Sequence, residues 1–446
     1  MQYKRSYVVY RLHLYKKISF MDIRFIDLFA WLWATRIGFE KACKELWLKS
    51  KCVFTSEIKP YAVKVYESNF TDHKVSWDIT TINENDIPDF DYLLWWFPCQ
   101  AFSVAWARRW FDDTRGTLFF DVARIIKAKK PKGFLLENVE WLVDHDKWET
   151  LSIILNVLTE LWYQTKWWIL NSKDFWVAQA RKRIYIVWHI DKNIELPKWK
   201  KSNHICFWDI QEYWKDILED DFCKLLLSHY SPNDLMWKSI KDKRWWDNNI
   251  HSWDIEYKWK TTIEQRELMS FLLKERRKKY WAEKKWMKRM DWIPLTLDDI
   301  YTTYWWWLFW DKKIILEMLE DLVQKWYLKK EHPKDIVISK DWKRETRSYR
   351  EDLPIWYNII AWKLSFPISK ILDPKWFTPT IVATDSSKIW VIDGDWIRRL
   401  TVLEWKRLFW IPDEFIMDIP YSKCFDLLGN TVVVPVITEV SKWLLS

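Results

Sequence analysis

The sequence contains very little glycine. Five glycines stand against 40 tryptophans in 446 residues, whereas glycine makes up about 7% of typical soluble domains. Many tryptophans lie where turns and helix ends favour glycine, among them Trp31, Trp33 and the run 305–307. We therefore interpret the excess as a codon effect, in which UGA was read as tryptophan although the natural host reads it as glycine. A protein genuinely rich in tryptophan is the alternative.

Paired cysteines and long apolar runs are also lacking. The six cysteines include no CxxC pair and have no histidine at ligand spacing, which argues against a disulfide framework and a zinc site. No apolar run approaches the roughly 18 residues of a membrane span. We therefore expect a cytoplasmic protein with no metal and no membrane partner. Residues 1–20 are an uncertain extension, either a basic arm on DNA or sequence upstream of a true start at Met21.

Positive charge is in modest excess. Lysine and arginine number 71 against 62 acidic residues, a formal net charge of +9, which favours a polyanionic partner without identifying it. The clearest basic stretch is Glu264–Arg289, and a solvated helix face explains it as well as a surface that contacts phosphates. The candidate DNA contacts in this stretch are Arg276, Arg277, Lys284 and Lys285.

The N-terminal half alternates short apolar runs with helical stretches, the pattern of a doubly wound, mainly parallel α/β sheet. Ligands of such sheets bind at the carboxyl ends of the strands. After about Leu196 the alternation stops, which predicts a second, smaller domain; within it, residues 295–330 read as two short helices around a turn. The expected strands are Phe25–Phe29, Cys52–Ser56, Tyr92–Leu94, Gly133–Leu136 and Arg183–Val187, and the expected helices include Gly116–Lys129 and Leu151–Leu161.

Aromatic and acidic residues follow the first strands. With glycine restored at Trp31 and Trp33, the segment Phe29–Trp33 becomes FAGLG, a turn that lets the backbone approach a nucleotide-like ligand. Glu57 ends the next strand, where an acid can bind ribose hydroxyls. Asp78 could accept a hydrogen bond from an adenine amino group. Taken alone this is a weak signal, because many nucleotide-binding folds share it.

The sharpest motif is PCQAFS, residues 98–103, directly after an apolar strand. A lone cysteine is more often a buried apolar residue than a nucleophile. Cys99, however, is accompanied by Glu137 in ENV, and by Arg181 and Arg183 in QARKR, each beside another predicted strand. This company supports Cys99 as a catalytic nucleophile rather than a buried apolar residue.

The order of the motifs FIDLFA, SEI, DI, PCQAFS, ENV, QARKRIY, RRLTVLE and GNTV resembles the DNA (cytosine-5) methyltransferase family of bacterial restriction–modification systems. The resemblance implies a Rossmann-like fold, S-adenosylmethionine as cofactor and duplex DNA as substrate. It also implies a catalytic lobe over 21–195, a target-recognition domain over 196–425 that includes RRLTVLE, and a C-terminal return over 426–446. We expect a monomer associated with the nucleoid. Whether a cognate restriction endonuclease accompanies it is left open.

The resemblance also assigns roles to residues. It implies that Cys99 attacks C6 of a cytosine flipped out of the duplex, that Glu137 binds N3, and that Arg183 binds O2 with Arg181 close by. The neighbours Pro98 and Gln100 belong to the same catalytic motif. The stretch from Ala101 to Arg115 would be a mobile loop that closes over the base, and Ser103 and Arg115 are candidate contacts to DNA phosphates or the groove. The cofactor set is Phe29, Trp31, Trp33, Glu57, Ile58, Asp78, Ile79 and Asn430.

Two alternatives remain at this point. Some relatives with the same motifs methylate transfer RNA, although the long middle region favours duplex DNA, whose major groove needs an added recognition surface. If Trp31 and Trp33 are genuine, the chain could instead be a DNA-binding relative without catalysis.

Overall fold

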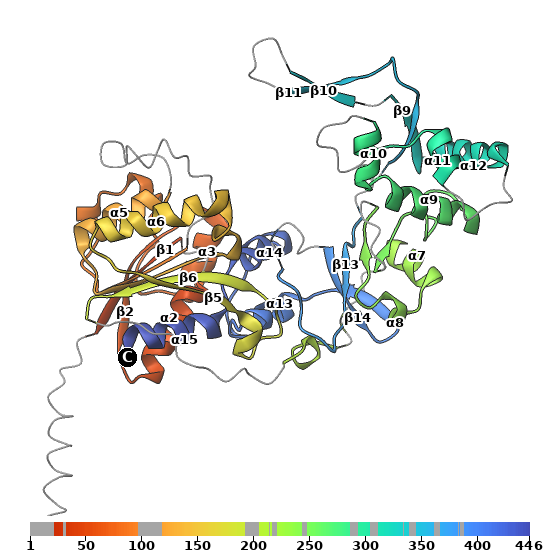
Figure 1. The fold of residues 1–446 in the computed structure, drawn as a ribbon. Helices are drawn as coiled ribbons and strands as arrows, with labels where there is room; N and C mark the ends of the chain where they lie inside the picture. Colours follow the sequence, from red (N-terminus) through yellow and green to blue (C-terminus); the bar gives the residue numbers. More distant parts are fainter. Residues whose placement is uncertain are drawn as a thin grey trace, which may run out of the picture. The chain divides into compact units, whose positions relative to one another are not determined.

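The computed structural model divides the chain into two compact units, shown in Figure 1. The catalytic unit, as we call it here, comprises residues 1–212, 374–386 and 400–446, and the second unit comprises 213–373 and 387–399. The structure describes residues 22–29, 33–96, 118–191, 205–213, 215, 221–242, 248–285, 293–303, 311–332, 334–338, 345–360, 366–381, 383 and 388–446.

A six-stranded sheet of order β2-β1-β3-β4-β6-β5 forms the centre of the catalytic unit. The first four strands in this order are parallel, whereas β6 runs antiparallel to both β4 and β5. The expected doubly wound, mainly parallel sheet is therefore confirmed. The strands are β1 Ile23–Leu28, β2 Ser50–Ser56, β3 Tyr92–Trp96, β4 Gly133–Val139, β5 Lys166–Asn171 and β6 Lys182–His189.

Helices cover both faces of this sheet, with α5 and α6 on one face and α2 and α15 on the other (Figure 1). Gly38 allows α2 and α15 to approach closely, because a Cβ there would lie 2.6 Å from Ile437. The helices of the unit are α2 Ala34–Glu45, α3 Pro60–Asn69, α5 Leu118–Lys129, α6 Glu149–Glu160, α13 Val402–Leu408, α14 Tyr421–Asn430 and α15 Val434–Leu445. Short 3-10 helices are η2 Ile79–Thr81, η3 Glu84–Asp86, η4 Glu140–Leu142, η5 His145–Trp148, η6 Ser172–Phe175 and η7 Phe207–Asp209.

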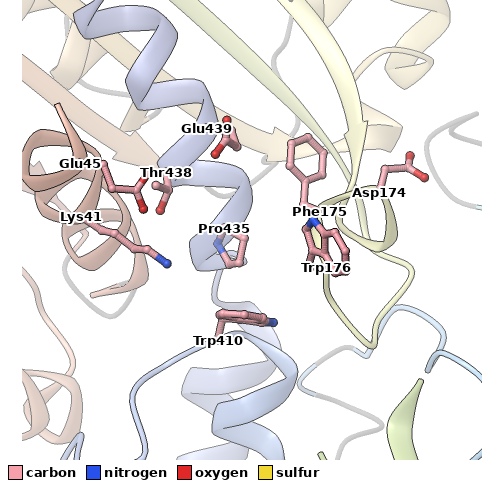
Figure 2. A pocket seen from close by; sticks show the side chains of 9 residues that line it. All are labelled: Lys41, Glu45, Asp174, Phe175, Trp176, Trp410, Pro435, Thr438 and Glu439. Atoms are coloured by element: carbon pink, nitrogen blue, oxygen red, sulfur yellow. The ribbon is translucent and has the colours of Figure 1, made fainter. Parts of the chain in front are cut away.

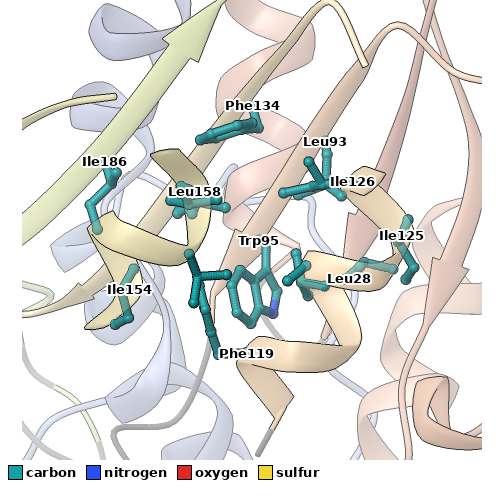
Figure 3. Close-up of a cluster of buried hydrophobic side chains, with 14 of the residues drawn as sticks. Leu28, Leu93, Trp95, Phe119, Ile125, Ile126, Phe134, Ile154, Leu158 and Ile186 are labelled. Carbon is teal, nitrogen blue, oxygen red and sulfur yellow. The ribbon is translucent and has the colours of Figure 1, made fainter. Parts of the chain in front are cut away.

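The main hydrophobic core lies between the sheet and the pair α5 and α6 (Figure 3). Alternate residues of the central strands enter it, as the two-residue period of a strand requires. Leu93 and Trp95 of β3 are both fully buried there, and the Trp95 ring stacks on Phe119 with ring centroids 5.9 Å apart. The intervening strand residues face α2 and α15, where Phe25 lies 4.8 Å from Phe39 between ring centroids.

All five expected strands are present, with ends that differ by a few residues. The strand β5 was missed, because its sequence KWWILN lacks alternation and most of its side chains are only partly buried or exposed. It is an edge strand that pairs only with β6. Its backbone hydrogen bonds, rather than a hydrophobic pattern, define it.

The division into units differs from the expected boundaries at 196 and 425. The segment 374–381 lies beside the residues that precede β6. Gln179 forms an isolated β-bridge with Thr378, and Ala180 N–H donates to Thr378 O at 2.7 Å. Residues 400–425 also belong with the catalytic unit, where Phe415 stacks on Trp33 at 5.1 Å between ring centroids. Chain order placed these segments with the middle region, whereas their contacts join them to the sheet.

The C-terminal segment Tyr421–Leu445 is long and apolar enough to cross a membrane by composition, but 78% of its most apolar window is buried inside the protein. It consists of two helices, α14 and α15, separated by a break at 431–433. Both pack as core helices of the catalytic unit.

The second unit contains a five-stranded sheet of order β15-β14-β13-β7-β8 and two separate two-stranded sheets, β10-β11 and β12-β9. The two short helices expected within 295–330 are present as α11 and α12. Its helices are α7 Asp221–His229, α8 Pro232–Leu235, α9 Ile263–Glu275, α10 Lys279–Lys284, α11 Leu297–Thr303 and α12 Lys312–Gln324. Its strands are β7 Ser239–Ile240, β8 Asn249–Ile250, β9 Leu328–Glu331, β10 Lys334–Ile338, β11 Glu345–Tyr349, β12 Trp356–Ile359, β13 Lys370–Leu372, β14 Ile389–Asp393 and β15 Trp396–Arg399.

Candidate active site

The register of the central sheet brings the ends of β1 to β4 and the start of β6 into one row. Leu28 pairs with Ser56 and with Trp95, Trp96 pairs with Glu137, and Val139 pairs with Arg183. Phe29, Glu57 and the segment that leads to Cys99 therefore leave the sheet at the same edge as Glu137. This edge is where ligands bind in doubly wound sheets.

Glu137 is the buried acid of this edge, with 1% of its surface exposed. Its Oε1 lies 3.1 Å from Nε of Arg183 across the β4–β6 pair. Burial raises the pKa of Glu137 to about 7, against the opposing effect of the Arg183 and Arg181 charges. A carboxyl with this pKa is shared between its protonated and ionised forms at neutral pH, so it can donate or accept a proton.

Arg181 is buried beside this pair but directs its hydrogen bonds elsewhere. Its Nη1 donates to Ile381 O at 2.8 Å and its Nη2 to Gly429 O at 3.3 Å. Its guanidinium also lies 5.5 Å from the ring centroid of Phe409. Burial and the repulsion of Arg183 lower the pKa of Arg181. Arg181 thus links the QARKR segment to three later parts of the chain.

Asp27 is a buried acid that sequence reasoning missed. It is 1% exposed on β1, its Oδ1 accepts a hydrogen bond from Thr35 Oγ1 at 2.8 Å, and burial raises its pKa to about 8. Its Oδ2 is buried without a hydrogen-bond partner among the described protein atoms. The available signal was an acid inside the apolar strand IRFIDL, since such residues are almost never fully buried without a reason.

Phe29 and Glu57 directly follow the first two strands, β1 and β2. Phe29 has a left-handed φ of 65°, and its N–H donates to Ser56 O at 2.9 Å. Glu57 is 4% exposed, and its Oε1 accepts hydrogen bonds from the N–H groups of Ile58 and Lys59 at 2.9 and 2.7 Å. The Glu57 carboxyl is therefore fixed in orientation at the strand end.

The remaining cofactor candidates of this region have more ordinary surroundings. Asp78 caps the 3-10 helix η2 through Oδ1, which accepts from Thr80 N–H at 3.0 Å. Ile79 is buried, and its carbonyl accepts from Arg124 at 2.6 Å, whereas Ile58 is 52% exposed. The capping contact accounts for one oxygen of Asp78.

Asp426 brings Asn430 into the neighbourhood of Glu57. Its Oδ2 accepts from Lys59 Nζ at 2.7 Å and from the hydroxyl of Tyr61, both just beyond Glu57. The side-chain amide of Asn430 donates to Asp426 O at 2.7 Å. The C-terminal helix α14 thus adjoins the second strand end, a contact between residues more than 360 positions apart.

Several candidates lie outside the described residues. These are Trp31 of the first turn and, from the segment after β3, Pro98, Cys99, Gln100, Ser103 and Arg115. Trp96, the last residue of β3, precedes Cys99 by three positions and pairs with Glu137. Among the residues that the structure describes, no group of His, Cys, Asp and Glu side chains is placed to hold a metal ion.

The four basic candidates of the second unit do not form one exposed row. The expected helix over 264–289 is divided into α9 and α10, and Arg276 is 3% exposed, with its pKa lowered to about 9 by burial and by Arg277. Lys285 is paired with Asp299 at 2.5 Å. Arg276 is therefore corrected from a phosphate contact to an interior residue. Lys284 keeps a half-exposed side chain.

A cavity of about 330 Å³ lies away from this edge, between α2, α15 and the loop after η6 (Figure 2). Lys41, Glu45 and Glu439 supply its charged wall, and Trp176 and Trp410 supply aromatic surface. None of the candidate catalytic or cofactor residues lines it.

Comparison with known proteins identifies the family. The model of the C-5 cytosine-specific DNA methylase family matches residues 23–446. The type II methyltransferase M.NlaIV of Neisseria lactamica is 47% identical over 436 residues, covering 95% of this chain and 99% of its own length. M.NgoBV of Neisseria gonorrhoeae, also a type II methyltransferase, is 46% identical over 431 residues with the same two coverages.

Among solved structures, the methyltransferase EhMeth of Entamoeba histolytica aligns over 95% of this chain and 98% of its own with a TM-score of 0.51. At 12% sequence identity this likeness supports the fold alone. The family resemblance expected from the motif order is confirmed by the family match. The chain belongs to the C-5 cytosine-specific DNA methylase family and is a DNA cytosine-5 methyltransferase.

Proposed function

We propose that the chain methylates C5 of cytosine within a specific duplex DNA sequence, with Cys99 as the covalent nucleophile. The observation that carries this proposal is the buried Glu137–Arg183 pair at the sheet edge, opposite the strand that leads to Cys99. An acid with a pKa of about 7 beside a fixed cation suits a ring that gains negative charge during the reaction.

The residues at this edge suit S-adenosylmethionine. When bound, S-adenosylmethionine supplies the methyl group. The oriented carboxyl of Glu57 would bind ribose hydroxyls, Phe29 offers an aromatic face, and Asp78 and Asn430 offer polar groups at the neighbouring strand ends. One feature suits the cofactor poorly, namely the indole of Trp33 buried in the first turn.

Cys99 would act first as a thiolate that forms a bond to C6 of the cytosine ring. Glu137 would hold a proton at N3 and Arg183 would bind O2, so that the ring accepts the electron pair. C5 would then use that electron pair to form a bond to the methyl group, whose bond to the sulfonium sulfur of S-adenosylmethionine breaks. Removal of the C5 proton returns the electron pair, breaks the bond from C6 to sulfur and restores the Cys99 thiolate.

Arg181 would be a positioning residue rather than a catalytic one. Its two guanidinium hydrogen bonds reach the backbone of Ile381 and Gly429, and neither reaches Glu137. It would hold the QARKR segment, and with it Arg183, against the parts of the chain that return from the second unit.

Recognition of the target would belong to the second unit, which lies between the shared motifs. Because Cys99 cannot reach a stacked base, the cytosine would be flipped out of the duplex. Ser103 and Arg115 would contact the DNA around it. The relatives are type II methyltransferases, and we propose that this chain likewise protects DNA from a cognate restriction endonuclease.

The decisive experiment is covalent trapping on duplex DNA that carries 5-fluorocytosine, from which fluorine cannot leave as a proton does. The chain is assayed as written and with glycine at Trp31 and Trp33. We expect an adduct that resists denaturant, lost in Cys99→Ala but kept in the matched control Cys206→Ala, since Cys206 is a partly exposed free thiol of the same unit. An adduct that survives Cys99→Ala would assign the nucleophile to another cysteine.

A competition assay addresses transfer RNA as the alternative substrate. Duplex DNA should compete for methyl transfer and transfer RNA should not. Preferential competition by transfer RNA would overturn the assignment of duplex DNA as the substrate.

A further inference from the structure

We infer that tryptophan stands for glycine at the left-handed positions of this chain, and that in the natural protein the first turn of the cofactor site has no indole. The inference rests on backbone geometry, and only its last consequence rests on the proposed function. Eleven described non-glycine residues have a positive φ, and seven of them are tryptophans. Tryptophan is only 40 of the 446 residues, so the overall composition does not explain why tryptophan is so frequent at left-handed positions.

The end of α2 shows the geometry. Trp47 follows the C-cap Leu46 with a φ of 60°. Its N–H donates to Lys44 O at 3.1 Å, and the N–H of Leu48 donates to Cys43 O at 2.8 Å. This pair of bonds defines a Schellman motif, whose left-handed residue is usually glycine because a Cβ there meets the following carbonyl.

Three further helices end in the same way. In each, the left-handed residue donates to the carbonyl three positions earlier and the next residue donates to the carbonyl five positions earlier. The left-handed residue is a tryptophan every time. These are Trp162 after α6, Trp326 after α12 and Trp410 after α13, with φ values of 71°, 62° and 58°. Both units contribute, so the pattern belongs to the whole chain.

The side chains at these positions support the same conclusion. Trp47 is 87% exposed and Trp162 is 91% exposed. A large apolar side chain left in water, on a backbone conformation that it disfavours, gains little packing to offset the strain. Glycine avoids both costs, because it has no Cβ and populates the left-handed region readily.

The buried tryptophans point in the same direction. The indole N–H groups of Trp33, Trp253, Trp390 and Trp405 are buried, and none has an acceptor among the described protein atoms. A buried indole usually finds a hydrogen-bond partner. An indole that stands for glycine has no acceptor arranged for it, which fits these four residues; Trp237 of the left-handed set differs, since its indole N–H donates to Asp373 Oδ2 at 3.1 Å.

Two of the left-handed tryptophans also line the cavity of Figure 2. Trp176 has a φ of 61° and Trp410 a φ of 58°, and both contribute aromatic surface to it. With glycine at both positions the cavity loses that surface. The aromatic surface from these two residues is therefore not a feature of the natural protein, whereas Phe175 and the charged residues would still line the cavity.

The consequence for the cofactor site concerns Trp33, which lies outside the left-handed set with a φ of −32° and is included because its buried indole N–H has no acceptor among the described protein atoms. Its indole is fully buried and stacks on Phe415 with ring centroids 5.1 Å apart, directly before α2. Glycine there would leave space between the first turn and the segment that contains Phe415. The turn after Phe29 would then present backbone rather than an indole to the cofactor.

The first test is the mass of the protein from its natural host. Peptides that contain positions 47, 162, 326 and 410 should each be lighter than the written sequence by the difference between a tryptophan and a glycine residue. Tryptophan at these positions would overturn the inference. This result does not depend on methyl transfer, so it separates the inference from the proposed function.

The second test compares two sets of variants. Glycine at Trp47, Trp162, Trp326 and Trp410 should raise the melting temperature by about 2–4 °C per position. The matched control has glycine at four exposed tryptophans outside the left-handed set, namely Trp77, Trp208, Trp259 and Trp376, and should bring no such gain. Equal effects in the two sets would contradict the geometric argument.

A third measurement addresses the cofactor turn. Calorimetry should show at least tenfold tighter binding of S-adenosylmethionine when Trp31 and Trp33 are both glycine than in the chain as written, and Trp208→Gly should leave binding unchanged. Unchanged binding in the double variant would overturn the consequence for the turn while leaving the mass result intact.

Discussion

The two units differ in the length and arrangement of their strands. In the part of the chain that the structure describes, the catalytic unit is built on one continuous sheet with strands of five to eight residues and a large main core. The second unit has strands of two to five residues in three sheets and two smaller clusters. Buried strands of fixed register can hold Glu137 and Arg183 in place, whereas short strands and loops leave a surface that can vary between relatives without disturbing catalysis.

The buried charges of the two units differ accordingly. In the catalytic unit Asp27, Glu137 and Arg181 occur on or beside the strands of the sheet edge. In the second unit the buried pair Asp242 and Arg276 lies close enough to interact electrostatically. Because a buried charge costs free energy unless it is compensated, its location indicates either a site or an internal brace, and the following predictions separate the two.

The largest effect is expected from Glu137→Gln. The amide keeps the size of the carboxyl but cannot give up a proton to N3, so single-turnover methyl transfer should fall by about 10²–10⁴-fold. Glu140→Gln is the control, because Glu140 is a partly exposed neighbour that pairs with Lys182. Equal rates in the two variants would remove Glu137 from the catalytic machinery.

A pair of core substitutions tests whether the units are independent. Leu93→Ala in β3 and Leu268→Ala in α9 each remove a fully buried side chain, which should cost about 2–5 kcal/mol of unfolding free energy. Hydrogen exchange followed by mass spectrometry should show faster exchange only in the unit that carries the substitution. Faster exchange throughout the chain after Leu268→Ala would show that the two units unfold as one.

The free energy of unfolding of the catalytic unit should depend on pH up to a higher pH than that of the second unit. The pKa values of Asp27 and Glu137 are raised to about 8 and about 7, so the folded state binds more protons than the unfolded state above pH 4. Stability should therefore fall as pH rises from about 4 to about 8. In the second unit the pKa of Asp242 is raised to about 6, and the loss should end at lower pH.

Urea unfolding midpoints at a series of pH values check this prediction. Asp27→Asn should flatten the decline between pH 6 and 8, and Asp242→Asn should flatten it only below about pH 6. A decline that persists unchanged in Asp27→Asn would mean that another group titrates.

The smallest effect is expected from Lys284→Gln in the second unit. Lys284 is half-exposed, so its loss should weaken DNA binding modestly and reduce the salt slope by about one without changing the preferred sequence. Lys285→Gln should instead lower stability, because Lys285 pairs with Asp299 and also donates to Pro294 O. A changed sequence preference in Lys284→Gln would show that this residue reads bases.

Much of the catalytic unit could be predicted from local patterns. Apolar runs located the five strands other than β5, and the motifs placed Glu137 and Arg183 beside adjacent strands. The second unit was predicted only as a smaller domain with two helices near 295–330. Strands of two or three residues, such as β7 and β13, are too short to show a period. The burial of Arg276 was not predictable either, because a basic run gives no indication of which cation turns inward.

The sequence by itself determined the family, the order of the strands' functional residues and the abnormal content of tryptophan, because these depend only on which residue stands at which position. Only the tertiary structure decided the proton affinity of Glu137 and Asp27, since burial raises their pKa values and burial depends on the packed sheet. It also decided that Arg181 binds the backbone of Ile381 and Gly429. Contacts between residues about 200 and 250 positions apart arise from the folded chain, and no local pattern encodes them.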